Sequence, residues 1–408
     1  MNQIQKEFPI LQQKVNGNPI AYLDNAATSQ KPVSVLKALE EFYTTSNANP
    51  HRGVYDLAMR ATQAFEASRK VVADFIGVKD EAEVIFTRNA TEALNLIAYS
   101  YGMNFLSAED GITISVAEHH SNLVPWQQVA KVTGASLDYL YLTDGAQISD
   151  EEIAAKITEK TKLVSVVHIS NVLGVVFPLE KIVKRAREVG AVVVLDCAQS
   201  IPHIPVDVQK LDVDFAAFSG HKMYAPLGIG VLWGRRSLLE KMPPFLSGGD
   251  MIDSVEEQVT SYAPIPQKFE AGTQNAGGAV ALAAAIRFMQ KIGWEEITRI
   301  EHDLMAYALD GLRQLPYVTV LGGSIPAEER YGVISFNVQD AHPHDVASIL
   351  DADGVCIRAG HHCAQPLLHH LNLYAANRIS FAVYNTREDI DAFLNSLKKV
   401  RGVLGYGS

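Results

Sequence analysis

The sequence predicts an α/β fold: a mainly parallel sheet flanked by helices, followed by a smaller α/β unit. Short β-branched runs alternate with helical patterns from about residue 80 onward. Strand, helix and strand in this order imply right-handed crossovers and a sheet that is buried on both faces. The run AVVVLD at 191–196 supports this, because it is almost wholly apolar and ends in a single acid. The preceding PLEKIVKRAREVG has apolar residues at helical spacing and closes on Gly190.

We assign the other elements in chain order. Strands of the large sheet are expected within 111–120, 161–170, 191–200, 213–220 and 229–234. An Ala-rich helix before residue 293 and a long helix at 294–315 lead to shorter units. These are strands within 318–322, 333–338, 355–360 and 378–384, and helices within 344–354 and 386–405. The predicted division is a large domain at 18–290 and a small domain formed by 1–17 with 291–408.

Composition and net charge limit the classes of function that we expect. Hydrophobic residues make up 48% of the 408 residues and charged residues 20%, which is typical of a folded chain. A formal net charge of -11 argues against nucleic acid or an acidic membrane surface as the partner. The start lacks a secretory signal pattern, and no stretch approaches the roughly 18 apolar residues of a membrane span. We therefore expect a cytoplasmic protein that acts on a small molecule or on a protein partner.

Lys222, in FSGHKMYAP, is the first candidate for chemistry. A lysine is usually a solvated charge, but this one follows a predicted strand and lies among small, apolar and aromatic residues. A desolvated lysine has a depressed pKa and forms a Schiff base with a carbonyl cofactor. Pyridoxal phosphate is such a cofactor, and it would need further partners at the same edge of the sheet.

The chain offers a candidate for each need of that cofactor. Asp196, at a strand end, would keep the pyridine nitrogen protonated. Loop and helix-start donors would bind phosphate, His119 would stack on the ring and Gln199 would reach the ring hydroxyl. Each of these residues could also have an ordinary structural role, such as a capping threonine or a packed histidine, so the inference rests on the whole set. The phosphate candidates are Thr91, Ser219 and His221.

Together these motifs identify a family. RAGHHCAQP, SGHK, DCAQS, AEHHSN, NPHRG and YLDNAATSQKP resemble the group II, SUF-type cysteine desulfurases, which are class V pyridoxal-phosphate enzymes of fold type I. The resemblance runs from about residue 8 to the C-terminus. It implies the roles given above for Lys222, Asp196, Gln199 and His119 and the phosphate set of Thr91, Ser219 and His221.

The resemblance also implies features that the residues alone do not reveal. Thr273 would reach the phosphate of the other subunit, which makes the protein a homodimer. Arg378 would take the substrate carboxylate, while Arg358 and Asn171 match other active-site positions. The sequence departs from the usual pattern at Cys197, where glycine is common, and at Ala225 and Leu227, which replace a glycine and a threonine.

The expected activity depends on the chemical role of Cys363. With three cysteines and no CxxC pair, a disulfide is disfavoured. Zinc is disfavoured because His361, His362 and Cys363 are consecutive and their side chains point different ways. A buried inert thiol stays open as an alternative. We favour a partly exposed thiol near cationic groups, which is typical of a reactive cysteine.

The expected reaction converts L-cysteine to L-alanine and leaves a persulfide on Cys363. The resemblance implies that a sulfur-acceptor protein then takes the sulfur for iron-sulfur cluster assembly. Two related activities stay open, selenocysteine lyase on L-selenocysteine and cysteine sulfinate desulfinase. A non-catalytic metal-binding or sulfur scaffold is the alternative from another class. No resident metal is expected.

Overall fold

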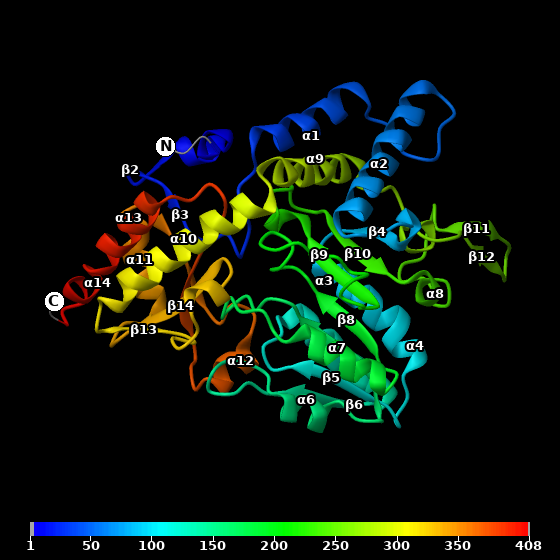
Figure 1. Cartoon of the computed structure of the whole chain (residues 1–408). Helices are drawn as coiled ribbons and strands as arrows, with labels where there is room; N and C mark the ends of the chain where they lie inside the picture. Colours follow the sequence, from blue (N-terminus) through cyan, green and yellow to red (C-terminus); the bar gives the residue numbers. More distant parts are fainter. Residues whose placement is uncertain (1–3, 407–408) are drawn as a thin grey trace.

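A computed structural model of the chain describes residues 4–406, and its centre is a seven-stranded sheet (Figure 1). The strand order is β4-β10-β9-β8-β7-β5-β6. Strands β6, β5, β7, β8 and β9 run parallel, and β10 is antiparallel to both β9 and β4. The strands are β4 (Val84–Thr87), β5 (Gly111–Ser115), β6 (Ser136–Leu140), β7 (Thr161–Val167), β8 (Val192–Asp196), β9 (Phe215–Ser219) and β10 (Gly230–Gly234). This confirms the predicted fold class.

Helices cover both faces of this sheet, so its central strands are buried on two sides. In β8, Val193 and Leu195 face one hydrophobic core while Val194 faces the other. The first core includes side chains from α1, α2 and α9, and the second includes side chains from α3 and α5. The bounds are α1 (Val33–Thr45), α2 (Asp56–Phe75), α3 (Ala90–Leu96), η4 (Ile97–Gly102), α4 (Met103–Phe105), α5 (Val124–Thr133), α6 (Asp150–Lys156), α7 (Leu179–Glu188), α8 (Arg236–Leu239) and α9 (Ala276–Ile292).

A second sheet of four antiparallel strands follows, in the order β13-β14-β17-β16. Helices α10, α11 and α13 pack on it around a core that includes Leu304, Phe336, Ile379 and Phe393. Both ends of the described chain lie on this side of the molecule (Figure 1). The bounds are β13 (Val318–Val320), β14 (Val333–Val338), β16 (Arg358–Gly360), β17 (Ala376–Ser380), α10 (Trp294–Arg313), α11 (Pro343–Ala352), α12 (Gln365–His370), α13 (Arg387–Leu397) and α14 (Val400–Val403).

The N-terminal segment contributes to a strand pair outside these two sheets. Strand β3 (Ala21–Tyr22) pairs in parallel with β15 (Val355–Cys356), although residues 21–22 fall within the predicted large domain. The single strand predicted at 355–360 breaks at Ile357, so that β15 pairs with β3 and β16 pairs with β17. The division into two domains stays a prediction, and residues 1–3 and 407–408, which it also covers, lie outside the described part of the chain.

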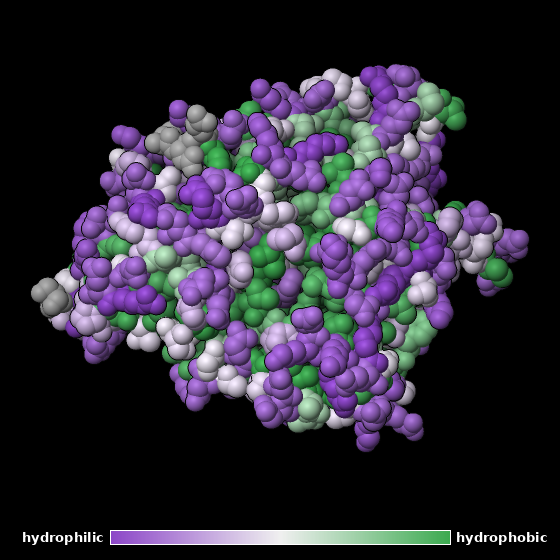
Figure 2. All heavy atoms as spheres, viewed as in Figure 1, coloured by the Kyte–Doolittle hydropathy of each residue, from purple (hydrophilic) through white to green (hydrophobic). Residues whose placement is uncertain are grey.

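Short elements complete the description. They are the strand pairs β1 (Lys14–Val15) with β2 (Asn18–Pro19) and β11 (Ile252–Val255) with β12 (Thr260–Tyr262), and the 3-10 turns η1 (Gln5–Glu7), η2 (Pro9–Gln12), η3 (Glu81–Glu83), η5 (His120–Asn122), η6 (Gly220–Lys222), η7 (Gln267–Phe269) and η8 (Ala327–Glu329). The β11–β12 hairpin stands out from the body (Figure 1). Polar residues cover much of the visible face, with hydrophobic ones gathered toward its middle (Figure 2). Within residues 4–406, no helix combines the length and the apolar character that crossing a membrane requires.

Candidate active site

A cavity of about 530 Å³ opens beyond the carboxyl ends of β7, β8 and β9, where ligands of parallel sheets bind. Side chains of the large sheet line one side, and residues of β16, β17 and the segment after β16 line the other. The cavity brings together all of the predicted site residues except Thr273, namely Thr91, His119, Asn171, Asp196, Gln199, Ser219, His221, Lys222, Arg358, Cys363 and Arg378. His344, from the start of α11, also lines it and was missed by the sequence argument.

Lys222 ends the 3-10 turn that follows β9. Its Nζ makes no hydrogen bond or ion pair with any residue among 4–406. Burial lowers the pKa of this amine to about 8, opposed by the nearby Asp196 carboxylate and assisted by the Arg378 charge. A lysine of this kind keeps a reactive neutral fraction near neutral pH.

The loop that carries Lys222 is fastened by a distant segment. The His221 carbonyl oxygen accepts hydrogen bonds from Ser29 N (3.0 Å), Ser29 Oγ (3.1 Å), Thr28 Oγ1 (3.1 Å) and Lys31 Nζ (3.1 Å). Ser29 Oγ also accepts a bond from the backbone N–H of Tyr224 at 2.8 Å. Thr28, Ser29 and Lys31 belong to the motif YLDNAATSQKP, but nothing in that motif indicates that they hold the lysine loop.

Asp196 and Gln199 lie at the end of β8. Asp196 is 2% exposed, and its Oδ1 accepts a hydrogen bond from Ala198 N at 2.9 Å. Burial raises the pKa of this carboxyl, while the Ala198 N–H and the Lys222 charge lower it. Gln199 donates from Nε2 to the Ala26 carbonyl at 2.9 Å, and its buried Oε1 has no partner in the described structure.

His119 follows β5 and lies at the wall of the cavity. The Ser121 N–H donates to His119 Nδ1 at 3.1 Å, so the neutral ring carries its proton on Nε2. Burial lowers the pKa of His119 to about 3, with Lys222 as a further cause, and the ring is therefore neutral. The adjacent Glu118 is fully buried and accepts bonds from Val167 N (2.9 Å) and Asn122 Nδ2 (2.6 Å).

A helix start and a hydroxyl also line the cavity. Asn89 caps α3 by accepting from Glu92 N at 3.0 Å, and Ala90 N donates to Ser219 Oγ at 2.8 Å. Thr91 is exposed on the first turn. Gly230 allows this wall to close on the sheet, because a Cβ there would lie 2.5 Å from Asn89 Cα. The result is a set of small polar groups that suits an anion.

Thr273 lies apart from the cavity. It is exposed and lines a neighbouring depression with Arg88, Gly228 and Leu246. The single chain therefore does not bring Thr273 to the other predicted phosphate ligands.

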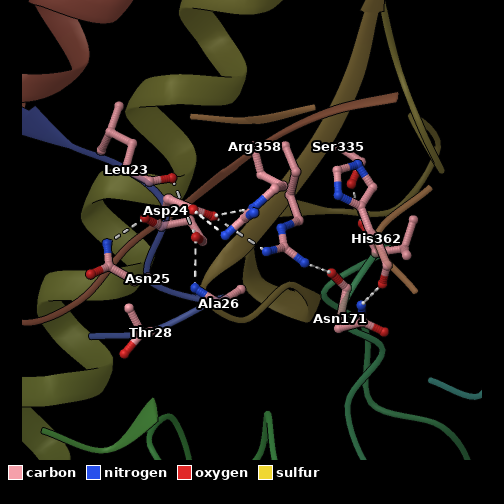
Figure 3. Close-up of polar contacts among 12 residues, drawn as sticks. Leu23, Asp24, Asn25, Ala26, Thr28, Asn171, Ser335, Arg358 and His362 are labelled. Carbon is pink, nitrogen blue, oxygen red and sulfur yellow. Dashed lines mark hydrogen bonds and ion pairs between the residues drawn. The ribbon is translucent and has the colours of Figure 1, made fainter. Parts of the chain in front are cut away.

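Cys363 is exposed, and its backbone is held in an unusual conformation. His362 and Cys363 have φ angles of 52° and 55°, a region that residues other than glycine rarely adopt. Hydrogen bonds to both carbonyl oxygens secure them, from Asn171 Nδ2 to His362 O (2.8 Å) and from His120 N to Cys363 O (2.7 Å). Just after the turn, Gln365 N donates to His120 Nε2 (3.2 Å). Figure 3 shows the Asn171 side chain directed at this loop. The cysteine is thus presented by a fastened turn.

Two arginines face each other across β16 and β17. Arg358 and Arg378 are directly opposed in the antiparallel register, and Asp24 lies against both. Figure 3 shows Asp24 beside Arg358. Arg378 is 4% exposed and donates from NH1 to the Asn171 carbonyl at 3.0 Å, while its buried Nε has no partner in the described structure. Burial lowers the pKa of Arg378 to about 10. A buried guanidinium with a free donor suits a carboxylate.

Neither the other cysteines nor Ala225 and Leu227, where the sequence departs from the family pattern, has unusual surroundings. All three cysteines are free, and Cys197 is fully buried, which raises the pKa of its thiol. Ala225 is buried, whereas Leu227 is 72% exposed. Among residues 4–406, His, Cys, Asp and Glu side chains form no group of three or more that could hold a metal ion.

Comparisons with known proteins agree with this geometry. The model of the class-V aminotransferase family matches residues 21–393. A probable cysteine desulfurase of Halalkalibacterium halodurans is 49% identical over 99% of both chains, and one of Streptomyces coelicolor is 49% identical over 98% of this chain and 97% of the relative. The apo structure of a cysteine desulfurase from Thermococcus onnurineus NA1 superposes with a TM-score of 0.92 at 41% identity, covering 98% of each chain. The chain therefore belongs to the class-V aminotransferase family, in the branch that contains the cysteine desulfurases.

Proposed function

We propose that the protein is a pyridoxal-phosphate-dependent cysteine desulfurase that forms a persulfide on Cys363. One observation carries the proposal: Lys222 and Cys363 line the same cavity as Asp196 and Arg378. An amine, a thiol, an acid and a carboxylate-binding cation are the groups that the reaction needs. The relatives named above bear the name of this activity, which supports the assignment.

The cavity suits the cofactor. Gln199 Oε1 and His221 Nδ1 are buried without partners, and Lys222 Nζ is likewise unbonded within residues 4–406. Asp196 would hold the ring nitrogen, Gln199 the ring hydroxyl, and Thr91, Ser219 and His221 the phosphate. When bound, the cofactor supplies an electron sink for the carbon atoms of the amino acid.

The protein's own residues would divide the remaining work. Arg378 binds the substrate carboxylate, and the neutral His119 stacks on the ring. The Lys222 amine moves the proton at the substrate Cα, which its lowered pKa of about 8 favours. Asn171 keeps the cysteine turn in place through its bond to His362 O.

Cys363 would take the sulfur. The substrate Cβ–S bond breaks, a bond forms between Cys363 Sγ and that sulfur, and a proton goes to Cβ to complete L-alanine. Carbon is reduced as sulfur is oxidised from the thiol to the persulfide level, so no external oxidant is required. Cys363 is exposed, and a persulfide there is open to a sulfur-acceptor protein in iron-sulfur cluster assembly of the SUF type, in the cytoplasm.

A homodimer would complete the site. Thr273 is exposed outside the cavity, in the depression lined also by the exposed Leu246, and the adjoining Leu227 is 72% exposed. The projecting β11–β12 hairpin carries Val255 at 61% exposure. Exposed apolar side chains of this kind are typical of a protein interface. A second copy seated here would be able to bring its Thr273 to the phosphate ligands of the first.

The test is a spectrum combined with product analysis. The purified holoenzyme should be yellow, should lose that absorbance in Lys222→Ala, and should convert L-cysteine to L-alanine. Cys363→Ser should keep the colour and lose alanine formation. L-Selenocysteine and L-cysteine sulfinate serve as alternative substrates: turnover of either by Cys363→Ser, with none of L-cysteine by the native enzyme, would replace the proposal by the related activity. A colourless protein would refute it.

A further inference from the structure

Glu118 is a fully buried carboxyl that takes no part in the proposed chemistry. Its Oε1 accepts hydrogen bonds from Val167 N at 2.9 Å and from the Ser115 hydroxyl, and its Oε2 accepts from Asn122 Nδ2 at 2.6 Å. Among the described residues, 4–406, no lysine, arginine or histidine forms an ion pair with it. Burial raises the pKa of this carboxyl, and the three donors lower it. Because Val167 and Asn122 donate to different oxygens, both oxygens must accept whether or not the carboxyl carries a proton.

The amide of Asn122 is held in one orientation. Its Oδ1 accepts from Ser165 Oγ at 2.6 Å and from Trp126 Nε1 at 3.1 Å, and an indole N–H can only donate. The NH2 group of Asn122 is therefore left facing Glu118. Asn122, Ser165 and Trp126 are all 0% exposed, so bulk water offers no substitute partner for any of these bonds.

The segment that begins with Glu118 carries two contacts of the site. His119, the next residue, lines the cavity, and the N–H of His120 donates to the Cys363 carbonyl oxygen at 2.7 Å. The backbone positions of these two histidines follow from that of Glu118, because the three residues are consecutive in the chain. A shift of this one segment therefore moves the His119 ring and the Cys363 turn together.

The Glu118 side chain ties this segment to the central sheet. Val167, whose N–H donates to Glu118 Oε1, is the last residue of β7 and the register partner of Asp196 in β8. Asp196 in turn lines the cavity. Glu118 thus fixes its segment relative to the strand end that carries the expected ligand of the cofactor ring nitrogen.

We propose that Glu118 is a positioning residue that places the His119 ring over the cofactor and, through His120, places the Cys363 thiol for sulfur transfer. The inference deepens the proposed function and rests on it for the identity of the cofactor and of the reaction. Glu118 acts through the backbone of its own segment, since its carboxyl bonds to neither His119 nor Cys363. A misplacement of about 1 Å at reacting groups lowers a rate by up to about a hundredfold.

Glu118→Gln is a nearly isosteric change that breaks this arrangement. In either orientation of the new amide, its NH2 group meets the N–H of Val167 or the NH2 of Asn122. Adding Asn122→Asp repairs the pattern, because one oxygen of the new carboxylate accepts from the new amide and the other accepts from Ser165 and Trp126. The double variant has the charge and nearly the volume of the native pair.

The experiment follows the holoenzyme by visible circular dichroism of the bound cofactor and by the rate of persulfide formation on Cys363 in a single turnover with L-cysteine. Glu118→Gln should change the dichroism band and slow persulfide formation by about tenfold or more, because a buried donor is left without an acceptor. Adding Asn122→Asp should return the band to its native form and the rate to within about threefold of the native rate. Glu109→Gln, at an exposed glutamate, makes the same charge change and should alter neither value.

Ser165→Ala keeps the inference testable if Glu118→Gln does not fold. It removes one of the two donors that hold the Asn122 amide and introduces no opposing group. The dichroism band should again depart from its native form, and persulfide formation should slow by about threefold.

A folded Glu118→Gln variant that is less stable to heat, yet keeps the native band and the native rate, would show a purely structural role and overturn the inference. A folded double variant as slow as Glu118→Gln would overturn it too, as would native values in Ser165→Ala where Glu118→Gln does not fold. Failure of the native holoenzyme to convert L-cysteine would instead refute the proposed function, and the dichroism of the same variants would still report on the placement of His119.

Discussion

The backbone N–H of His120 donates a hydrogen bond to the carbonyl oxygen of Cys363 at 2.7 Å, which fastens the turn of the reactive thiol to the loop that carries His119. His120 Nε2 also accepts from Gln365 N, so one residue bonds both to Cys363 and to the backbone two positions after it. The two consecutive positive φ angles at His362 and Cys363 are maintained by such contacts. The thiol is therefore presented by the large sheet as much as by the small one.

Asn171→Ala should loosen this turn. The substitution removes the bond to His362 O but keeps the backbone carbonyl that binds Arg378. Loss of one buried hydrogen bond costs about 1–3 kcal/mol, so persulfide formation should slow by about tenfold or more, while L-alanine binding changes little. Single-turnover quenching with L-cysteine measures the rate. Asn104→Ala, an exposed asparagine bonded to Tyr99 O, is the matched control. Equal rates in both variants would contradict the role given to Asn171.

Ser29→Ala should weaken the lysine loop. It deletes the acceptor of the buried Tyr224 N–H and one donor to the His221 carbonyl. An unsatisfied buried N–H costs about 1–3 kcal/mol, which should appear in the free energy of unfolding of the holoenzyme and in faster release of the cofactor. Denaturant unfolding and cofactor absorbance after dialysis measure the two effects. Ser136→Ala, on the exposed edge strand, should change neither. Cofactor release at the native rate would exclude a holding role for Ser29.

The pH dependence of turnover should follow Lys222. A base must be unprotonated to act, and the neutral fraction of an amine rises as the pH rises through its pKa of about 8. Alanine formation should therefore increase between about pH 7 and pH 9. The pKa of His119 lies near 3, so this ring contributes no titration in that range. A rise centred near the ordinary histidine value that vanishes in His119→Asn would assign the proton transfer to the histidine instead.

Much of the fold was predictable because the central strands are buried on both faces. Val193, Val194 and Leu195 are all apolar for this reason, and the acid that follows them marks the ligand end of the sheet. Edge and joining elements were less predictable. The segment 355–360 reads as one strand, yet it divides between β3 and β17, because strand partners are chosen by the tertiary fold and not by local pattern.

The site was predictable where the chemistry depends on residue type, as for Lys222, Asp196 and Cys363. The residues that hold them were not. Ser29 meets the lysine loop 192 residues away in sequence, and Asp24 meets Arg378 across 354 residues. Neither an isolated serine nor an isolated aspartate indicates such a contact. The reactive residues could therefore be predicted from the sequence, whereas the positioning residues are recognised only in the structure.

The most direct test is the mass of the peptide that contains Cys363, measured after the holoenzyme has met L-cysteine without an acceptor or reductant. The account predicts that this peptide gains the mass of one sulfur atom, in step with the L-alanine released in the first turnover, and that peptides containing Cys197 or Cys356 gain none. Alanine formed with an unmodified Cys363 peptide, or sulfur found on another cysteine, would contradict it.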